Sequence, residues 1–536
     1  MWAWATYGLN DDVFLFGNSI ESFIEHCAED NYTFFFHNLK FDGDFIINYL
    51  LRNGWKWVKE TRDMEAKTFT TLISDMGVWY SIELCHSIVK GIRHTTKIQD
   101  SLKLLPFSVA QVAKTFDLPI SKLELDYETF REVGHELTEH EIDYIRNDVE
   151  IMAKALRLMR DAGLVKMTIG SNALTDFKKL YGKKRFEHTF PAPDYDDKIR
   201  SAYRGGFTYC NPKFQGKDIG EGIVLDVNSL YPSVMYDCPM PYGDGVRFEG
   251  EYEQDDDYPL YVQGIRAIFY LKEGHIPTIQ IKNTLLFQPN EYISDTKDEV
   301  VTLNLTSVDL QLLKDQYNIT YIEYIGGYKF RSCDNAFKEY IDKWNAVKVK
   351  ATLDGNKGMR QIAKLMLNNL YGKFATNPVA QSKMPVLDED GMVRYKLLPE
   401  EARNPVYIPV GVFITAWARN KTIRSAQAVY DRFLYADTDS LHLIGTDIPD
   451  NLDISPTKLG AWKHESTFTR ARFLKQKTYV EESGGKLTVT CAGMPYACHE
   501  HVTWENFHIG SVYDGKLKQK RVRGGVILEK GEHTIK

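Results

Sequence analysis

A chain of 536 residues is too long for one hydrophobic core, so two or more domains are expected. Its 43% hydrophobic and 26% charged residues are typical of soluble globular proteins, and no apolar run approaches the roughly 20 residues of a membrane span, which excludes an integral membrane protein. The net charge of −7 argues mildly against a chain that binds polyanions over its whole surface, but the basic tract at 516–523 permits a local positive groove.

The cysteines and the first residues indicate the cellular compartment. The seven cysteines are scattered without the spacing of a disulfide framework, and the N-terminal residues lack the pattern of a secretory signal. Together they predict a reducing, cytoplasmic location.

Two regions of different character follow one another along the chain. Residues 1–166 alternate strand-like runs with helical patterns, which predicts an α/β domain. Residues 167–536 mix strands and helices irregularly, as an α+β region does, and two stretches interrupt them. The stretch 238–337 has β-rich pieces bounded by Pro and Gly, which predicts an inserted subdomain, and 375–408 has the pattern of an extended hairpin.

Three aspartates in the second region are candidate metal ligands. Asp226 directly follows the apolar run Ile223–Leu225, where a buried strand would emerge. Asp437 and Asp439 lie two residues apart in a strand-like run, so we expect both carboxylates to project from one face of a strand. A D-x-D pair alone is more often a turn or a surface feature.

Carboxylates that converge in a partly buried place repel one another unless cations neutralise them. Oxygen ligands favour magnesium, and a pair of metal ions about 3.5–4 Å apart can activate a nucleophile and stabilise a leaving oxygen. The three aspartates therefore predict a divalent-metal site for phosphoryl transfer.

A helix predicted at 359–374 has two different faces. One face is apolar and the other is polar, and the ordinary alternative is an amphipathic surface helix. The apolar stripe consists of Ala363, Leu367, Leu370 and Phe374, and the polar face of Arg360, Lys364, Asn368 and Tyr371. Cations followed by an amide and a phenol could bind a triphosphate and stack on its base.

Four motifs in this order resemble those of family B DNA polymerases. DVNSLYP, KLMLNNLYG and YADTDS are similar to motifs A, B and C, and LKQKTYV is similar to the K-x-Y motif. AYRGGF, the two insertions, and stretches such as FHNLKFDG, GVFITAWAR and HESTF further resemble the protein-primed branch found in small tailed bacteriophages. The resemblance covers nearly the entire chain.

The resemblance implies a fold and a set of residue roles. The fold would be an RNase H-like 3′–5′ exonuclease domain at 1–166, followed at 167–536 by a right-hand polymerase of palm, fingers and thumb with the two insertions. Two Mg²⁺ ions, or Mn²⁺, would be held by Asp226 and Asp439, with Asp437 as their neighbour and the carbonyl of Val227 as a further ligand. Tyr231 would pack under the sugar and exclude a 2′-hydroxyl.

Further roles concern the nucleotide and the DNA. Lys348, or else Lys350, would bind the triphosphate together with Arg360 and Lys364, and Asn368 and Tyr371 would line the nascent base pair. The template would be held by Tyr203, Arg204, Gly205 and Gly206, and the primer end by Lys477 and Tyr479. The basic tract 516–523 fits a thumb that binds duplex phosphates.

The same resemblance implies partners. Primer-template DNA and deoxynucleoside triphosphates would be the substrates, and a terminal protein would supply the priming hydroxyl. The two insertions would encircle DNA and give processive, strand-displacing replication of a viral genome. We expect a monomer without membrane contact in the cytoplasm of an infected bacterium.

The first domain resembles a proofreading exonuclease with an incomplete site. Its matching residues are Asn38, Asp42, Lys122, Tyr144 and Asp148, of which Asp42 and Asp148 would bind metal. In the family a D-x-E pair precedes the segment that begins this chain, and nothing here corresponds to it. We therefore expect weak or absent proofreading, either because the domain is a remnant or because the natural beginning is missing.

Two alternatives to a polymerase remain at this point. A glycosyltransferase also uses a D-x-D pair to bind metal and a nucleotide diphosphate, but it does not require Lys364, Asn368 and Tyr371 on one helix. A catalytically idle DNA-binding or capsid-associated protein derived from a polymerase would not need intact aspartates in motifs A and C.

Overall fold

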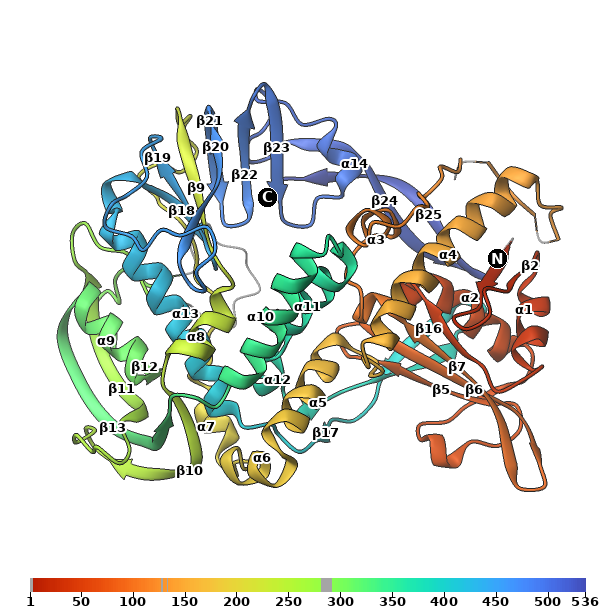
Figure 1. The fold of residues 1–536 in the computed structure, drawn as a ribbon, viewed down its shortest axis with the longest axis horizontal. Helices are drawn as coiled ribbons and strands as arrows, with labels where there is room; N and C mark the ends of the chain where they lie inside the picture. Colours follow the sequence, from red (N-terminus) through yellow and green to blue (C-terminus); the bar gives the residue numbers. More distant parts are fainter. Residues whose placement is uncertain (1–2, 127–128, 133, 281–291) are drawn as a thin grey trace.

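The computed structural model describes residues 3–126, 129–132, 134–280 and 292–536, and Figure 1 shows their arrangement. Two α/β regions lie on opposite sides of a central group of helices, and a long hairpin spans from one side to the other above these helices (Figure 1). Among the described residues, no helix is both long enough and apolar enough to cross a membrane.

The first domain is built on a mixed five-stranded sheet in the order β3-β7-β6-β5-β4. The strands are β3 (Thr33–Phe36), β4 (Lys56–Trp57), β5 (Thr68–Ile73), β6 (Trp79–Val89) and β7 (Ile92–Asp100). Helices α1 (Ile20–Cys27) and α2 (Leu39–Arg52) bury their apolar faces against this sheet. A separate hairpin of β1 (Trp4–Tyr7) and β2 (Phe14–Gly17) packs on helix α4.

Helices α3 (Val109–Thr115) and α4 (Glu139–Asp161) follow the sheet in sequence but belong to another core. Each begins with a capping box, from Ser108 to Gln111 and from Thr138 to Glu141, which satisfies N–H groups of the first turn. The apolar face of α4 joins the large core of the second region rather than the core of the sheet. The hydrophobic cores therefore divide near residue 104, earlier than the predicted domain boundary at 166.

The predicted palm is an antiparallel five-stranded sheet in the order β20-β9-β19-β18-β8. Its strands are β8 (Thr208–Cys210), β9 (Gly222–Val227), β18 (Phe433–Asp437), β19 (Ser440–Ile444) and β20 (Trp462–Phe468). Helices α8 (Leu230–Asp237) and α13 (Ile408–Ala428) pack against one another and α13 also contacts β18 and β19. Because most of α13 is buried, its sequence is apolar on nearly every side.

The predicted fingers are two antiparallel helices, α10 (Lys338–Leu353) and α11 (Lys357–Asn369). The helix expected at 359–374 is interrupted at Leu370, after which the single turn α12 (Tyr371–Phe374) follows. The expected apolar stripe is confirmed, since all four of its residues are buried. Helices α5 (Ile169–Tyr181), α6 (Lys183–Thr189) and α7 (Asp196–Arg200) connect the first domain to the palm.

Both interruptions form β structure. In the first, helix α9 (Ser307–Gln316) packs on a four-stranded sheet ordered β10-β13-β11-β12. Its strands are β10 (Met240–Glu249), β11 (Leu260–Leu271), β12 (Val301–Thr306) and β13 (Tyr317–Cys333). The second interruption is a nested hairpin of β14 (Val379–Ala380), β15 (Lys383–Leu387), β16 (Val393–Leu397) and β17 (Glu401–Ala402).

The C-terminal part has the place expected of a thumb. It consists of β21 (Arg470–Lys475), β22 (Thr478–Ser483), β23 (Lys486–Cys491), α14 (Tyr496–His499), and the hairpin of β24 (Val512–Val522) and β25 (Gly525–Thr534). This hairpin reaches across to α2 of the first domain (Figure 1). Short 3₁₀ turns lie at Thr61–Asp63, Ser101–Lys103 and Tyr430–Arg432.

Three remote segments meet at Asp44 on α2. The hydroxyl of Tyr395 on β16 donates to Asp44 Oδ1, and Arg521 Nε on β24 lies 3.3 Å from Asp44 Oδ2. The Arg521 guanidinium also lies 4.7 Å from the centre of the Tyr395 ring. This three-way contact joins the first domain, the second interruption and the C-terminal hairpin.

Candidate active site

Asp226 and Asp439 are brought together by strand pairing. Asp226 is the second-last residue of β9 and the only residue of that strand that is not buried, and its backbone partner on β19 is Ser440. The N–H of Val227 donates to the carbonyl of Asp439 at 2.7 Å. The turn that carries Asp439 is therefore fastened to the strand that carries Asp226.

Asp437 and Asp439 do not share one face of a strand, contrary to the expectation from their spacing. Asp437 ends β18, and Thr438 in the turn has a left-handed φ of 59°. The reversal turns the Asp437 carboxylate toward Lys477 Nζ, 2.9 Å from both oxygens, and toward the Thr208 hydroxyl at 3.0 Å. The two-residue alternation holds only in extended backbone, and this chain leaves the extended conformation at Thr438.

The charges of Asp226 and Asp439 oppose one another. Burial and the neighbouring Asp226 charge raise the pKa of Asp439 to about 6. Burial likewise raises the pKa of Asp226, although Lys463 and Lys364 act in the opposite direction. Two neighbouring carboxylates disfavour each other's ionised form. A cation bound between them would offset this repulsion.

The residues present fit an open magnesium site. Among the described residues, no three acidic, histidine or cysteine side chains are already arranged as a closed metal cage. Magnesium commonly takes one or two carboxylates and completes its shell with water and substrate phosphates. Asp226, Asp439 and the Val227 carbonyl suit that pattern, whereas Asp437 is engaged by Lys477 and Thr208.

Tyr231 and Tyr371 cover the site from the side of the fingers. Tyr231 lies in the first turn of α8, after Ser229 with a left-handed φ of 58°. Tyr371 begins α12, and the two rings stack at 3.9 Å with an angle of 19°. The negative charge of Asp439 contributes to the raised pKa of Tyr371, after burial, so the ring pair lies beside the carboxylates.

The cations of the fingers face the same region. The pKa of Lys348 is lowered by burial and by the charges of Arg360, Lys364 and Lys463. Lys350 instead points outward and pairs with Asp354 at 2.5 Å. Of the two lysines considered for triphosphate binding, Lys348 therefore has the suitable position. Asn368 is half-buried on the same helix as Arg360 and Lys364.

The segment predicted to hold template is partly structural. Arg204 is only 4% exposed and donates to the carbonyls of Ala202 and Asn304 at 3.1 and 3.0 Å. Its side chain is therefore buried against the protein backbone, and the role of this segment in holding template stays a prediction. A Cβ atom at Gly206 would lie 2.6 Å from the Thr438 hydroxyl, so glycine allows this segment to approach the catalytic turn. Tyr203 is half-buried close to Tyr371.

Lys477 and Tyr479 join the thumb to the palm. Lys477 lies between β21 and β22 with a left-handed φ of 53°, and its N–H donates to the Tyr435 hydroxyl at 2.8 Å. Tyr479 packs in an aromatic group with Tyr435 and Phe473, whose ring centres are 5.0 and 5.2 Å away. Through its pair with Asp437, Lys477 reaches the catalytic turn.

The exonuclease residues lie on α2, on α4 and in the segment that precedes α4. Lys122 Nζ donates to the Tyr144 hydroxyl at 3.0 Å and to Asp148 Oδ2 at 2.5 Å, as the i, i+4 spacing of Tyr144 and Asp148 suggested. Asp42 lies in the first turn of α2, where burial and the charge of Asp100 raise its pKa to about 7. Asn38, the N-cap of α2, has a left-handed φ of 70°.

Asp100 was missed by sequence reasoning. It ends β7 and is 2% exposed, and its Oδ1 accepts from the N–H groups of Asn38 and Leu102, each at 3.0 Å. An acidic residue at the end of an alternating strand was the available signal. Its position resembles that of Asp226, but its Oδ1 already accepts two backbone hydrogen bonds.

Lys463 was also missed. It lies on β20 directly opposite Asp226, with its Nζ 3.5 Å from Asp226 Oδ2 and 2.8 Å from Glu465 Oε2. The segment HESTF (464–468), which was noticed through its resemblance to the family, begins directly after Lys463.

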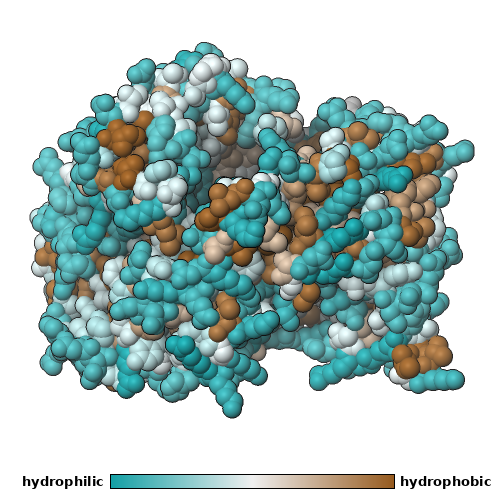
Figure 2. All heavy atoms as spheres, in the orientation of Figure 1, coloured by the Kyte–Doolittle hydropathy of each residue, from teal (hydrophilic) through white to brown (hydrophobic). Residues whose placement is uncertain are grey.

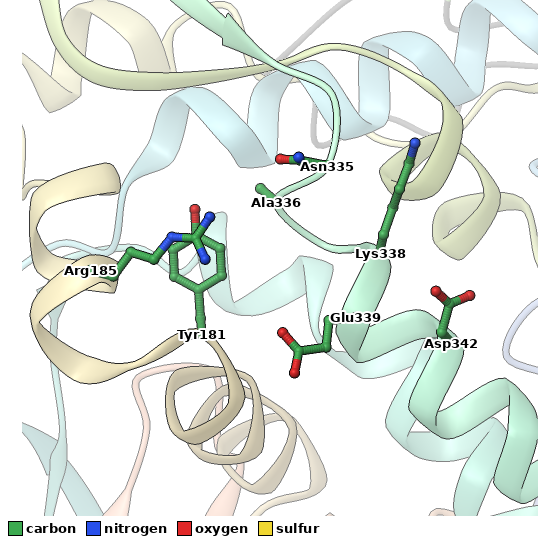
Figure 3. A pocket seen from close by; sticks show the side chains of 7 residues that line it. All are labelled: Tyr181, Arg185, Asn335, Ala336, Lys338, Glu339 and Asp342. Atoms are coloured by element: carbon green, nitrogen blue, oxygen red, sulfur yellow. The ribbon is translucent and has the colours of Figure 1, made fainter.

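A surface pocket of about 420 Å³ lies away from this site (Figure 3). It is lined by Tyr181, Arg185, Asn335, Ala336, Lys338, Glu339 and Asp342. The Arg185 guanidinium covers the Tyr181 ring at 4.4 Å, and acidic and basic side chains share the walls. No predicted site residue lines this pocket.

Known proteins match this chain over its whole length. The family model for type B DNA polymerases of organelles and viruses matches residues 24–133 and 124–456. The DNA polymerase of Bacillus phage M2 is 47% identical over 559 residues, covering 100% of this chain and 96% of that protein. The DNA polymerase of Bacillus phage phi29 is 46% identical, with the same coverage.

A solved structure agrees with the sequence comparison. The phi29 DNA polymerase in complex with primer-template DNA and incoming nucleotides has a TM-score of 0.94 and 45% identity, covering 100% of this chain and 96% of that chain. The predicted fold class is confirmed, and the glycosyltransferase and idle-protein alternatives are set aside. The chain therefore belongs to the type B DNA polymerases of organelles and viruses, and it is a DNA-directed DNA polymerase of the kind found in Bacillus phages.

Proposed function

We propose that this polymerase replicates a viral genome by two-metal phosphoryl transfer at Asp226 and Asp439. The observation that carries the proposal is the approach of these two carboxylates at one end of the palm sheet, where a backbone hydrogen bond joins Val227 to Asp439 and the charge of Asp226 adds to burial in raising the pKa of Asp439. Divalent ions bound there would activate the primer 3′-hydroxyl and stabilise the leaving pyrophosphate. Asp437 acts with Lys477 to position the catalytic turn rather than as a direct metal ligand.

The surrounding side chains provide a nucleotide site. Lys348, Arg360 and Lys364 bind the triphosphate through charge-assisted hydrogen bonds. Tyr231 supports the sugar, and Tyr371 with Asn368 lines the base pair. Stacked as they are, Tyr231 and Tyr371 occupy the place that the sugar and base would take, so their separation accompanies nucleotide entry.

DNA would pass through the opening between thumb, palm and first domain. The hydrophilic surface is hollowed between the thumb and helix α11 (Figure 2). The three-way contact at Asp44 would close this path around the DNA and so support processive, strand-displacing synthesis. Basic residues of β24 would face duplex phosphates.

Protein priming is part of the same proposal. Its support is the first interruption, a separate sheet that packs against α13 beside the palm and offers a surface for a terminal protein. Deoxynucleotides, DNA and such a partner meet in the cytoplasm of an infected bacterium, where we place the activity.

We expect weak or absent 3′–5′ exonuclease activity. Asp148 is paired with Lys122, and Oδ1 of Asp100 already accepts hydrogen bonds from the N–H groups of Asn38 and Leu102.

One assay tests both activities. A labelled primer-template is incubated with Mg²⁺, with and without deoxynucleotides, using the wild-type chain, Asp439→Asn and the control Asp450→Asn at an exposed position. We expect extension by wild type and control, a loss of at least about a thousandfold in Asp439→Asn, and no shortening without nucleotides. Extension by Asp439→Asn would remove this residue from the metal site, and vigorous shortening would show a complete exonuclease site.

A further inference from the structure

Lys463 is a cation built into the palm beside the catalytic carboxylates. Its backbone is fixed by pairing of β20 with β9, where Lys463 and Asp226 are direct partners. Its Nζ lies 2.8 Å from Glu465 Oε2 and 3.5 Å from Asp226 Oδ2, and the side chain is 32% exposed. The ammonium group is thus held by two carboxylates but is not enclosed.

The partners of Lys463 would change if a divalent ion bound to Asp226. Without metal, its charge offsets that of Asp226. A divalent ion on Asp226 would take over this compensation and repel the nearby ammonium group. Because the lysine stem is flexible and partly exposed, Nζ can move to another anion without any change in the strand.

The cations near Lys463 indicate which anion its Nζ would then bind. Lys463 is one of the charges, with Arg360 and Lys364, that lower the pKa of Lys348 after burial. Lys364 also acts on both Asp226 and Asp439. Lys463, on the palm, therefore lies within electrostatic reach of Lys348, which belongs to the fingers.

We propose that Lys463 is a further triphosphate-binding residue, held by Asp226 and Glu465 until a divalent ion enters and then binding the phosphates of the incoming nucleotide from the palm side. The inference rests on the proposed nucleotide site and deepens it. The three cations of the fingers would bind one side of the triphosphate, and Lys463 the other.

The test compares Lys463→Met, Lys463→Gln and Lys463→Arg with wild type. Lys458→Met is a matched control, because Lys458 lies in the same segment and pairs with Asp453 at 2.7 Å on the surface. The dissociation constant of the next correct deoxynucleotide is measured in a complex with primer-template DNA and Ca²⁺, which supports binding without turnover. Binding of Mn²⁺ in the absence of nucleotide is followed by electron paramagnetic resonance.

We expect the Met and Gln variants to bind the nucleotide roughly five- to twentyfold more weakly, as the loss of one charge-assisted hydrogen bond predicts. The Arg variant and the Lys458→Met control should stay close to wild type, and Mn²⁺ binding should be unchanged or tighter. Circular dichroism identifies any variant that fails to fold. If one of the two neutral variants, Lys463→Met or Lys463→Gln, does not fold, the nucleotide affinity of the other one tests the proposal.

Unchanged nucleotide affinity in the neutral variants would overturn the proposal. A parallel loss of Mn²⁺ binding would also overturn it, since Lys463 would then act by positioning Asp226. Failure of the wild-type complex to bind any nucleotide would instead contradict the proposed nucleotide site, so the two failures are distinguishable.

Discussion

The catalytic turn shows how a few backbone contacts set the chemistry of individual residues. The left-handed Thr438 separates two aspartates that are neighbours in sequence, and the hydrogen bond from Val227 N–H to the Asp439 carbonyl joins two that are remote. As a result, Asp439 opposes Asp226, whereas Asp437 is neutralised by Lys477.

Metal binding should depend on pH through Asp439. Its pKa of about 6 means that protons compete with metal below that pH, so Mn²⁺ affinity should rise between about pH 5 and pH 7 and level off above. In the metal-free chain the raised pKa has the opposite effect on folding. The folded state retains a proton that the unfolded state has lost, so stability should fall as the pH rises from 3.8 to about 6.

Both statements are checked by measuring two quantities as functions of pH: the affinity for Mn²⁺ and the denaturation midpoint of the metal-free protein. Asp439→Asn is the control, because its amide does not titrate and both dependences should become flatter. Wild-type profiles without any change near pH 6 would contradict the prediction.

Tyr231 should determine sugar selection. Replacing it with Val opens the space beside Tyr371, so the ratio of ribonucleotide to deoxynucleotide kcat/KM should rise at least about tenfold, the scale on which pocket shape separates close analogues. Tyr231→Phe retains the ring and should keep the wild-type ratio. An unchanged ratio in Tyr231→Val would assign sugar selection to another residue.

At the scale of elements, helix α13 organises the second region. Arg419 on α13 is 1% exposed and contacts Asp309 on α9 at 2.8 Å, and its Nη1 donates to the carbonyls of Arg204 and Gly205 at 2.6 and 2.9 Å. One buried guanidinium therefore fixes the first interruption and the 203–206 segment to the helix behind the palm.

Removing this guanidinium should be costly. Arg419→Met leaves Asp309 buried without its partner, and we expect the free energy of unfolding to fall by about 3–5 kcal/mol. Arg424→Met is a matched control, because Arg424 joins the same two helices at 2.7 Å through the partly exposed Asp315, and its loss should cost at most about 1 kcal/mol. Chemical denaturation measures both, and equal losses would contradict the special role of the buried pair.

At the scale of the whole molecule, the three-way contact closes the chain upon itself. Arg521→Gln removes the charged partner of Asp44, a contact worth about 1.5–3 kcal/mol, and should shorten the product made in one binding event. Tyr395→Phe should have the same direction of effect without removing a charge.

Lys520→Gln measures the effect of losing a basic residue of the same hairpin while the contact at Asp44 is kept, because Lys520 pairs with Glu529 within the hairpin, and Arg521→Gln should shorten the product more than it does. Primer extension in the presence of excess trap DNA measures product length. Wild-type lengths for both Arg521→Gln and Tyr395→Phe would show that the contact does not retain DNA.

Local patterns in the sequence were sufficient for much of this molecule. The apolar stripe of α11, the strand that carries Asp226, and the hairpin pattern at 375–408 follow from side-chain periodicity, which depends only on neighbours along the chain. The ordered motifs indicated the polymerase family, which the comparisons confirm.

Only the tertiary structure decided which groups meet. Lys463 reaches Asp226 through strand pairing, Arg204 becomes buried beneath α13, and Asp44, Tyr395 and Arg521 converge from three remote segments. Periodicity cannot predict such encounters, because they depend on the order and register of strands and on how separate elements pack. The sequence by itself thus determined the elements and the class of chemistry, whereas long-range pairing determined the partners of each charge.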